Sequence, residues 1–149
     1  SHVYSENLVT SAQPTMDQIK ELKDAGFEVV INLTPTKEPW FAKEEEKLLE
    51  EAGVAYVHVS VSWANPSMDA LRQFFSAMKS HSNKKILVHC SHNARASAFV
   101  YLYRVALEKA PQQAEYELVE QIWANNPEYP LSKYMIWQDF LTRALPEIQ

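Results

Sequence analysis

Cys90 is the one cysteine of the chain, and its surroundings favour nucleophilic chemistry. An apolar run over residues 86–88 precedes it, and residues 91–94 lead into a stretch with helical periodicity. The first amides of a helix have no intrahelical partners, and with the helix dipole they attract an anion. A thiol at that place is stabilised as the thiolate, the nucleophilic form. The sequence therefore predicts a reactive Cys90 in an anion-binding loop.

Two side chains that follow Cys90 fit the same chemistry. Arg95 carries a planar, permanently charged guanidinium that suits the oxygens of a tetrahedral anion. Ser97 could donate a hydrogen bond to the sulfur and assist its departure as a leaving group. The alternative interpretation is an inert, buried Cys90 beside an Arg95 that forms a surface ion pair. The candidate catalytic residues are Cys90, Arg95 and Ser97, and the candidate phosphate-binding loop comprises Ser91, His92, Asn93, Ala94, Arg95 and Ala96.

The composition fits a single compact soluble domain over residues 1–149, with 46% hydrophobic and 22% charged residues. The net charge of -5 and the lack of a basic stripe argue against a nucleic-acid partner. No apolar run approaches the ~20 residues of a membrane helix. A lone cysteine excludes an intramolecular disulfide and the usual multi-cysteine zinc sites. We expect no metal, no cofactor and no membrane partner.

Helices and strands are expected to alternate along the first half of the chain. Thr15 begins a helix in a capping box with Gln18. The only two glycines, Gly26 and Gly53, stand where a helix should end and a strand begin. Strands that alternate with helices imply a mostly parallel sheet, with ligands beyond its carboxyl ends. The expected strands cover 27–33, 54–59 and 86–88, and the expected helices include 44–52, one capped by Ser67, one that begins at Ala96, and two more in the C-terminal third.

The run from His89 to Ser97 resembles the signature of protein tyrosine and dual-specificity phosphatases. The stretches 11–15 and 26–33 resemble the same superfamily. The chain is similar to a bacterial branch, the phosphatase-like domain of beta-lactamase-hydrolase-like proteins. In that branch we expect His-Cys-x-x-Asn-x-Arg-x-Ser and then a helix with Tyr-Leu-Tyr-Arg, which residues 89–97 and 101–104 match. The resemblance spans roughly Val9 to Phe140.

This resemblance implies a cysteine-phosphatase-like, three-layer α/β domain. Its central sheet would have four or five mostly parallel strands, flanked by helices, with a helical C-terminal third. The resemblance also implies hydrolysis of a phosphomonoester through a phosphocysteine intermediate on Cys90. The substrate would be a phosphorylated small molecule or a phosphoprotein, and phosphate or sulfate could occupy the loop.

Three positions depart from the common signature. Arg95 arrives one residue early, and Ala96 stands in the usual place of the arginine. Asn93 replaces the loop glycine, although asparagine tolerates a left-handed conformation. Residues 52–68 contain no Asp or Glu where the superfamily carries its general acid, and Ser62 takes that place. Since loss of a general acid typically costs ~10²–10⁴-fold in rate, slow turnover is expected.

His92 and Asp69 are the candidate general acids. His92 could protonate a leaving group near neutral pH, whereas Asp69 also fits an ordinary first-turn acid of a helix. His89 is expected to support the loop through hydrogen bonds. Trp63 either walls the pocket or packs in the core. The run 44–46 of glutamates is expected to form a solvated helix face.

Two other functions stay open. Some rhodanese-like sulfurtransferases share the spacing of Cys90 and Arg95, and a smaller loop favours a sulfane sulfur over a phosphate. A non-catalytic phosphate-binding module would keep the loop without turnover, and the missing acid favours it. The compartment is open too: the reducing cytoplasm suits a working thiolate, but a trimmed N-terminus would also allow the periplasm.

Overall fold

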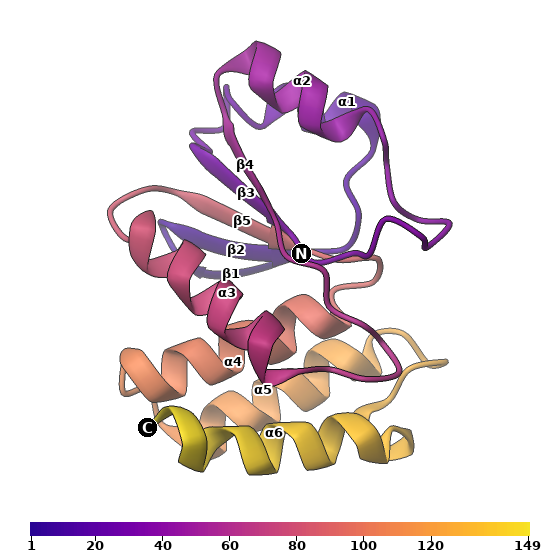
Figure 1. Ribbon diagram of the computed structural model, residues 1–149, viewed down its shortest axis with the longest axis vertical. Coiled ribbons are helices and arrows are strands. Elements are labelled where there is room, and N and C mark those ends of the chain that lie inside the picture. The colour runs from indigo at the N-terminus through magenta and orange to yellow at the C-terminus, as the bar shows by residue number, and fades with distance from the viewer.

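The computed structural model describes residues 1–149 and has three layers (Figure 1). A five-stranded sheet in the order β1-β2-β5-β3-β4 forms the middle layer. The helices α1 and α2 cover one face of the sheet, and α3 to α6 lie beneath the other. The predicted three-layer α/β fold with a helical C-terminal third is confirmed. The helices are α1 (Met16–Glu21), α2 (Glu45–Ala52), α3 (Met68–Ser80), α4 (Ala94–Leu107), α5 (Gln112–Ala124), the 3-10 turn η1 (Leu131–Lys133) and α6 (Met135–Ile148).

Four of the five strands run parallel, as predicted, and β1 pairs antiparallel with β2. The hairpin of β1 and β2 was not expected from the sequence. The edge strand β1 has no buried residue, so it lacks the apolar run that marks the inner strands. The strands are β1 (His2–Ser5), β2 (Leu8–Ser11), β3 (Val29–Asn32), β4 (Ala55–His58) and β5 (Ile86–His89).

Local capping signals fix where helices meet strands. Thr15 and Gln18 form the predicted reciprocal capping box at the start of α1. The hydroxyl of Ser67 accepts a bond of 3.1 Å from the Ala70 amide at the start of α3. Gly53 closes α2 with a left-handed φ of 78°, which glycine adopts without steric cost. These predicted caps are confirmed, and they set where α1 and α3 begin and where α2 ends before β4.

The apolar core lies mainly between the sheet and α3 to α6, and a smaller cluster lies under α1 and α2. Helix α4 is buried on nearly all sides, because it packs between the sheet and the outer helices. The short turn between β5 and α4 is therefore anchored at both ends by buried elements. None of the helices has the length and apolarity needed to span a membrane.

Candidate active site

The loop that follows β5 is held from both sides by neighbouring strands. The amide of Cys90 donates to the carbonyl of Ser11 at 3.3 Å, and the amide of Leu33 donates to the carbonyl of His89 at 2.9 Å. Cys90 is 1% exposed and lies just beyond the carboxyl end of the central strand. Its backbone is thus fixed at the edge of the sheet where parallel α/β folds bind ligands.

Asn93 turns the chain from this loop into α4. It has a left-handed φ of 70°, so asparagine does take the conformation expected at the missing glycine. The helix begins at Ala94 rather than at the expected Ala96. Residues 94–96 therefore belong to the first helical turn, and the loop itself is shorter than the sequence indicated. The first amides of a helix lack intrahelical partners, and Ala94 and Arg95 of this turn line the same pocket as Cys90.

Arg95 reaches the same pocket as Cys90 although it comes one residue early. The shorter loop places it in the first turn of α4, where its side chain is 5% exposed. Burial opposes its charge, but hydrogen bonds to Glu38 and the charge of Cys90 outweigh burial and raise the pKa of Arg95. The guanidinium is therefore a permanent positive charge inside the pocket.

Glu38 is the main pocket residue that the sequence did not reveal. Its carboxylate accepts bonds of 2.7 and 2.8 Å from the two terminal nitrogens of Arg95. It also accepts a longer bond of 3.4 Å from the Ser91 hydroxyl. Glu38 lies in the connection between β3 and α2 and belongs to no periodic pattern. The one available signal was its place after the carboxyl end of a predicted parallel strand.

An open pocket of about 210 Å³ lies above Cys90. The ring of His92 lies between Trp40 and Tyr129, with centroids 5.3 and 5.1 Å away. Trp63 walls the pocket and also stacks on Trp123, so both of its expected roles hold. The pocket is lined by Glu38, Pro39, Trp40, Trp63, Cys90, Ser91, His92, Ala94, Arg95 and Tyr129.

Of the candidate catalytic residues and general acids, Ser97 and Asp69 do not line this pocket, and neither do Asn93 and Ala96 of the expected loop. Ser97 is fully buried in α4, and its hydroxyl donates to the carbonyl of Ala94 at 2.9 Å. It would have to give up that bond to reach the sulfur. Asp69 lies on α3 with its side chain 88% exposed and bonded to Arg72 at 3.0 Å. The structure does not bring Asp69 to the pocket, which leaves His92 as the candidate acid that lines it.

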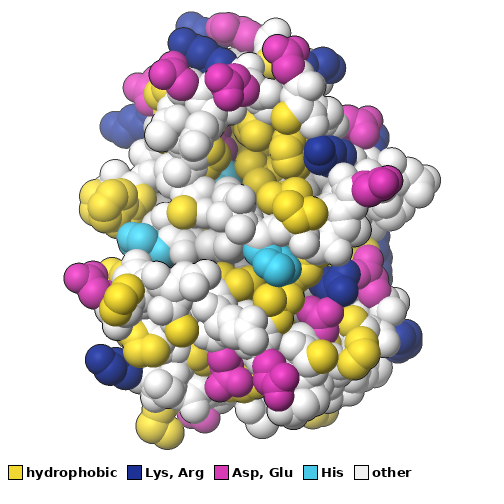
Figure 2. All heavy atoms as spheres, turned by 180° about the vertical axis from the view of Figure 1, so that it is seen from behind, with side chains coloured by type: hydrophobic (Ala, Val, Ile, Leu, Met, Phe, Trp, Pro, Cys, Tyr) yellow, Lys and Arg dark blue, Asp and Glu magenta, His cyan; other side chains and the backbone are white.

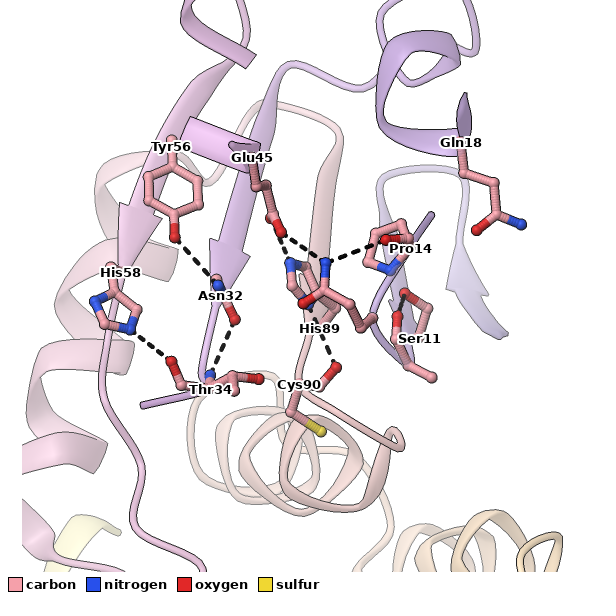
Figure 3. Close-up of polar contacts among 12 residues, drawn as sticks. Ser11, Pro14, Gln18, Asn32, Thr34, Glu45, Tyr56, His58, His89 and Cys90 are labelled. Carbon is pink, nitrogen blue, oxygen red and sulfur yellow. Dashed lines mark hydrogen bonds and ion pairs between the residues drawn. The ribbon is translucent and has the colours of Figure 1, made fainter. Parts of the chain in front are cut away.

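His89 and Glu45 form a buried pair behind the loop. The His89 Nε2 and the Glu45 Oε2 are 2.5 Å apart, and both side chains have no exposed surface. The Glu45 Oε1 accepts a bond of 2.8 Å from Gln13. Figure 3 shows His89 directed at Glu45, while the sulfur of Cys90 points to the opposite side. The imidazole thus lies behind the loop, bonded to Glu45, and does not line the pocket.

The expectation that residues 44–46 are all solvated is wrong at Glu45. The first turn of α2 lies over the end of the sheet, and the buried nitrogen of His89 offers that carboxylate a partner. Its neighbours Glu44 and Glu46 are exposed.

The positive charge of the pocket is local. On the face in Figure 2, lysine and arginine side chains are scattered among acidic ones and form no continuous patch. Among the pocket residues only Arg95 carries a permanent positive charge. No group of three or more His, Cys, Asp and Glu side chains is placed to hold a metal ion. An anion would therefore be held by Arg95 and the loop amides.

Comparison with known proteins places the chain among phosphatases. The family model described as "DSP-PTPase phosphatase fused to NAD+ Kinase" matches residues 3–132. A crystal structure described as a putative phosphatase (DUF442) from Shewanella putrefaciens CN-32 is similar, with 37% identity and a TM-score of 0.87. That match covers 99% of this chain and 90% of the other. A search of curated proteins finds no match.

More distant structures share the fold. The core catalytic domain of the PP-IP phosphatase SIW14 from S. cerevisiae has 19% identity and a TM-score of 0.74, over 95% of this chain and 82% of that one. TpbA from P. aeruginosa has 18% identity and a TM-score of 0.63, over 78% and 69%. The match over residues 3–132 and the 37% identity to the Shewanella protein show that this chain belongs to the dual-specificity and tyrosine phosphatase-like family.

Proposed function

We propose that this protein hydrolyses phosphomonoesters through a phosphocysteine formed on Cys90. The observation that carries the proposal is the position of Cys90 between the end of β5 and the first turn of α4, in one pocket with Arg95. A helix N-terminus and a guanidinium together stabilise both a thiolate and the oxygens of a phosphoryl group. Membership of a phosphatase family supports the same reaction.

The reaction would proceed in two displacements. The thiolate of Cys90 attacks phosphorus, and the bond from phosphorus to the leaving oxygen breaks. Arg95 and the first amides of α4 stabilise the charge on the equatorial oxygens. Water then attacks the phosphocysteine, which releases inorganic phosphate and restores the thiolate. Ser97 would assist that release by turning its hydroxyl from the Ala94 carbonyl to the sulfur.

His92 is the candidate group that protonates the leaving oxygen. It lines the pocket, and Trp40 and Tyr129 hold its ring on two sides. An imidazole can donate a proton near neutral pH. His92 would then replace the general acid that is missing from residues 52–68, before α3.

The substrate class follows from the size and lining of the pocket. A volume of about 210 Å³ admits a phosphoryl group and part of the group that carries it. The open mouth is compatible with a phosphorylated small molecule or with a phosphorylated side chain of a protein. Inorganic phosphate or sulfate would bind in the same place, as a product or as a product mimic.

The test is hydrolysis of an aryl phosphate under reducing conditions by wild type, by Cys90→Ser and by Asp69→Asn. The proposal predicts that Cys90→Ser falls to background. The exposed, remote Asp69→Asn variant should keep the wild-type rate. Equal rates in wild type and Cys90→Ser would contradict the proposal. Thiocyanate formed from thiosulfate and cyanide would indicate a sulfurtransferase instead, and phosphate binding without either activity would indicate a binding module.

A further inference from the structure

The guanidinium of Arg95 is already occupied by the protein's own groups. Its Nη1 donates to Glu38 at 2.7 Å and to the Val61 carbonyl at 2.9 Å. Its Nη2 donates to Glu38 at 2.8 Å and to the Ser91 hydroxyl at 3.1 Å. Since arginine has five N–H donors, four of them on these two nitrogens, only the Nε–H remains outside these bonds. A phosphoryl group that takes two bonds from Arg95 must therefore displace one of these partners.

Glu38 binds Arg95 in the same geometry as an anionic ligand would. The two carboxylate oxygens accept from the two terminal nitrogens side by side, which is the bidentate geometry that arginine also uses for phosphate. Both Glu38 and Arg95 line the pocket that contains Cys90. The carboxylate is thus an internal anion at the edge of the predicted phosphate site.

The charges make Glu38 and a phosphate competitors. With Cys90 as thiolate, the pocket holds two negative charges against the single positive charge of Arg95. A phosphate dianion beside Glu38 would add a strong like-charge repulsion in a partly buried site. The Glu38 side chain is 26% exposed and lies in a connection between β3 and α2, whereas Arg95 is 5% exposed in a packed helix. Of the other partners of Arg95, Val61 accepts through its backbone carbonyl and the Ser91 hydroxyl is uncharged, so Glu38 is the partner that a phosphate dianion would repel.

We propose that Glu38 determines which anions the pocket accepts, because it competes with them for Arg95. This inference rests on the proposed anion site. A planar monocarboxylate would make the same two bonds to Arg95 that Glu38 makes. Glu38 binds in preference because it belongs to the same chain and is always close to Arg95. A tetrahedral dianion has further oxygens for the amides at the start of α4, and it gains bonds that a carboxylate cannot make. Glu38 thus excludes weak anions and raises the concentration of phosphate needed for binding.

The test compares the affinity for inorganic phosphate of wild type, Glu38→Gln, Glu38→Ala and Glu44→Gln, by calorimetry at constant ionic strength. Glu44 is an exposed glutamate before α2, so Glu44→Gln removes the same charge without a contact to Arg95. Phosphate should bind Glu38→Gln and Glu38→Ala at least about tenfold more tightly than wild type, as removal of one nearby like charge predicts. Acetate should also begin to bind to both variants. Glu44→Gln should match wild type.

Weaker phosphate binding in the Glu38 variants would overturn the inference and make Glu38 a residue that positions Arg95. Unchanged binding, or no binding by any form, would overturn it as well. Thermal unfolding of each variant shows whether it folds. If Glu38→Ala does not fold, the phosphate affinity of Glu38→Gln, which keeps the size of the side chain, tests the inference. The measurement needs no turnover. Tighter phosphate binding by an inactive protein would leave this inference intact while the proposed hydrolysis failed.

Discussion

The imidazole of His89 and the carboxylate of Glu45 meet at 2.5 Å, and neither side chain is exposed. This pair joins the first turn of α2 to the last residue of β5, directly before Cys90. The other nitrogen of His89 lies 3.4 Å from the Cys90 carbonyl. The pair therefore fixes the backbone from which the proposed nucleophile projects.

Removal of Glu45 should destabilise the fold. Loss of one partner of a buried hydrogen-bonded pair typically costs about 1–3 kcal/mol, and more where a charge is involved, because the other partner is left desolvated without compensation. We expect Glu45→Ala to lower the free energy of unfolding by about 3 kcal/mol, measured by urea denaturation. The exposed neighbour Glu46 is the matched control, and Glu46→Ala should change stability by less than about 0.5 kcal/mol. Equal effects of the two variants would show that the buried pair contributes nothing.

Replacement of Arg95 by lysine should impair turnover. A lysine keeps the charge but lacks the planar fork that holds two oxygens at once. We expect the kcat/KM of Arg95→Lys for an aryl phosphate to fall by about 10²–10³-fold, the usual effect of removing a group that stabilises transition-state charge. Arg72→Lys on the surface of α3 should leave kcat/KM unchanged. A wild-type rate in Arg95→Lys would remove Arg95 from the mechanism.

If His92 is the general acid, the rate lost in a His92 variant should depend on the leaving group of the substrate. His92→Asn should hardly change the hydrolysis of an ester with a good leaving group, such as a nitrophenyl phosphate. The same variant should slow the hydrolysis of an alkyl phosphate by about 10²–10⁴-fold, because its poor leaving group needs the proton. Steady-state rates with the two substrates give the comparison. An equal loss with both would mean that His92 shapes the pocket rather than donates a proton.

Alkaline pH should destabilise the protein through two half-buried tyrosines, Tyr4 and Tyr56. Burial raises the pKa of Tyr4 and of Tyr56 from 10.0 to about 12. Because the folded chain holds these phenol protons more tightly than the unfolded chain, their contribution to stability is complete below pH 10. It is lost as the pH rises from about 10 to about 12. Urea denaturation across that range should show the loss, and Tyr56→Phe should reduce it. A free energy of unfolding independent of pH there would contradict the raised pKa values.

The parts of the fold that local sequence signals determine could be predicted. The cap at Thr15 and the left-handed Gly53 each depend on a few neighbouring residues, and both are confirmed. Cys90, Asn93 and Arg95 lie close together in sequence, so their shared place between strand and helix was also recognisable.

The parts that depend on distant partners could not be predicted. Glu38 and Arg95 are separated by 57 positions, and Glu45 and His89 by 44. Neither contact leaves a periodic pattern, and Glu45 stands in a glutamate run that is indistinguishable from a solvated helix face. Only the pairing of β3 with β5 and the docking of α2 bring these residues together.

The most direct test of the central claim is to trap the covalent intermediate. Wild-type protein would be mixed with an aryl phosphate, quenched in acid within the first turnover and analysed by peptide mass spectrometry. The account predicts one phosphoryl group on the peptide that contains Cys90, and none on that peptide in Cys90→Ala. Turnover that leaves Cys90 unmodified in wild type, or that persists in Cys90→Ala, would contradict it.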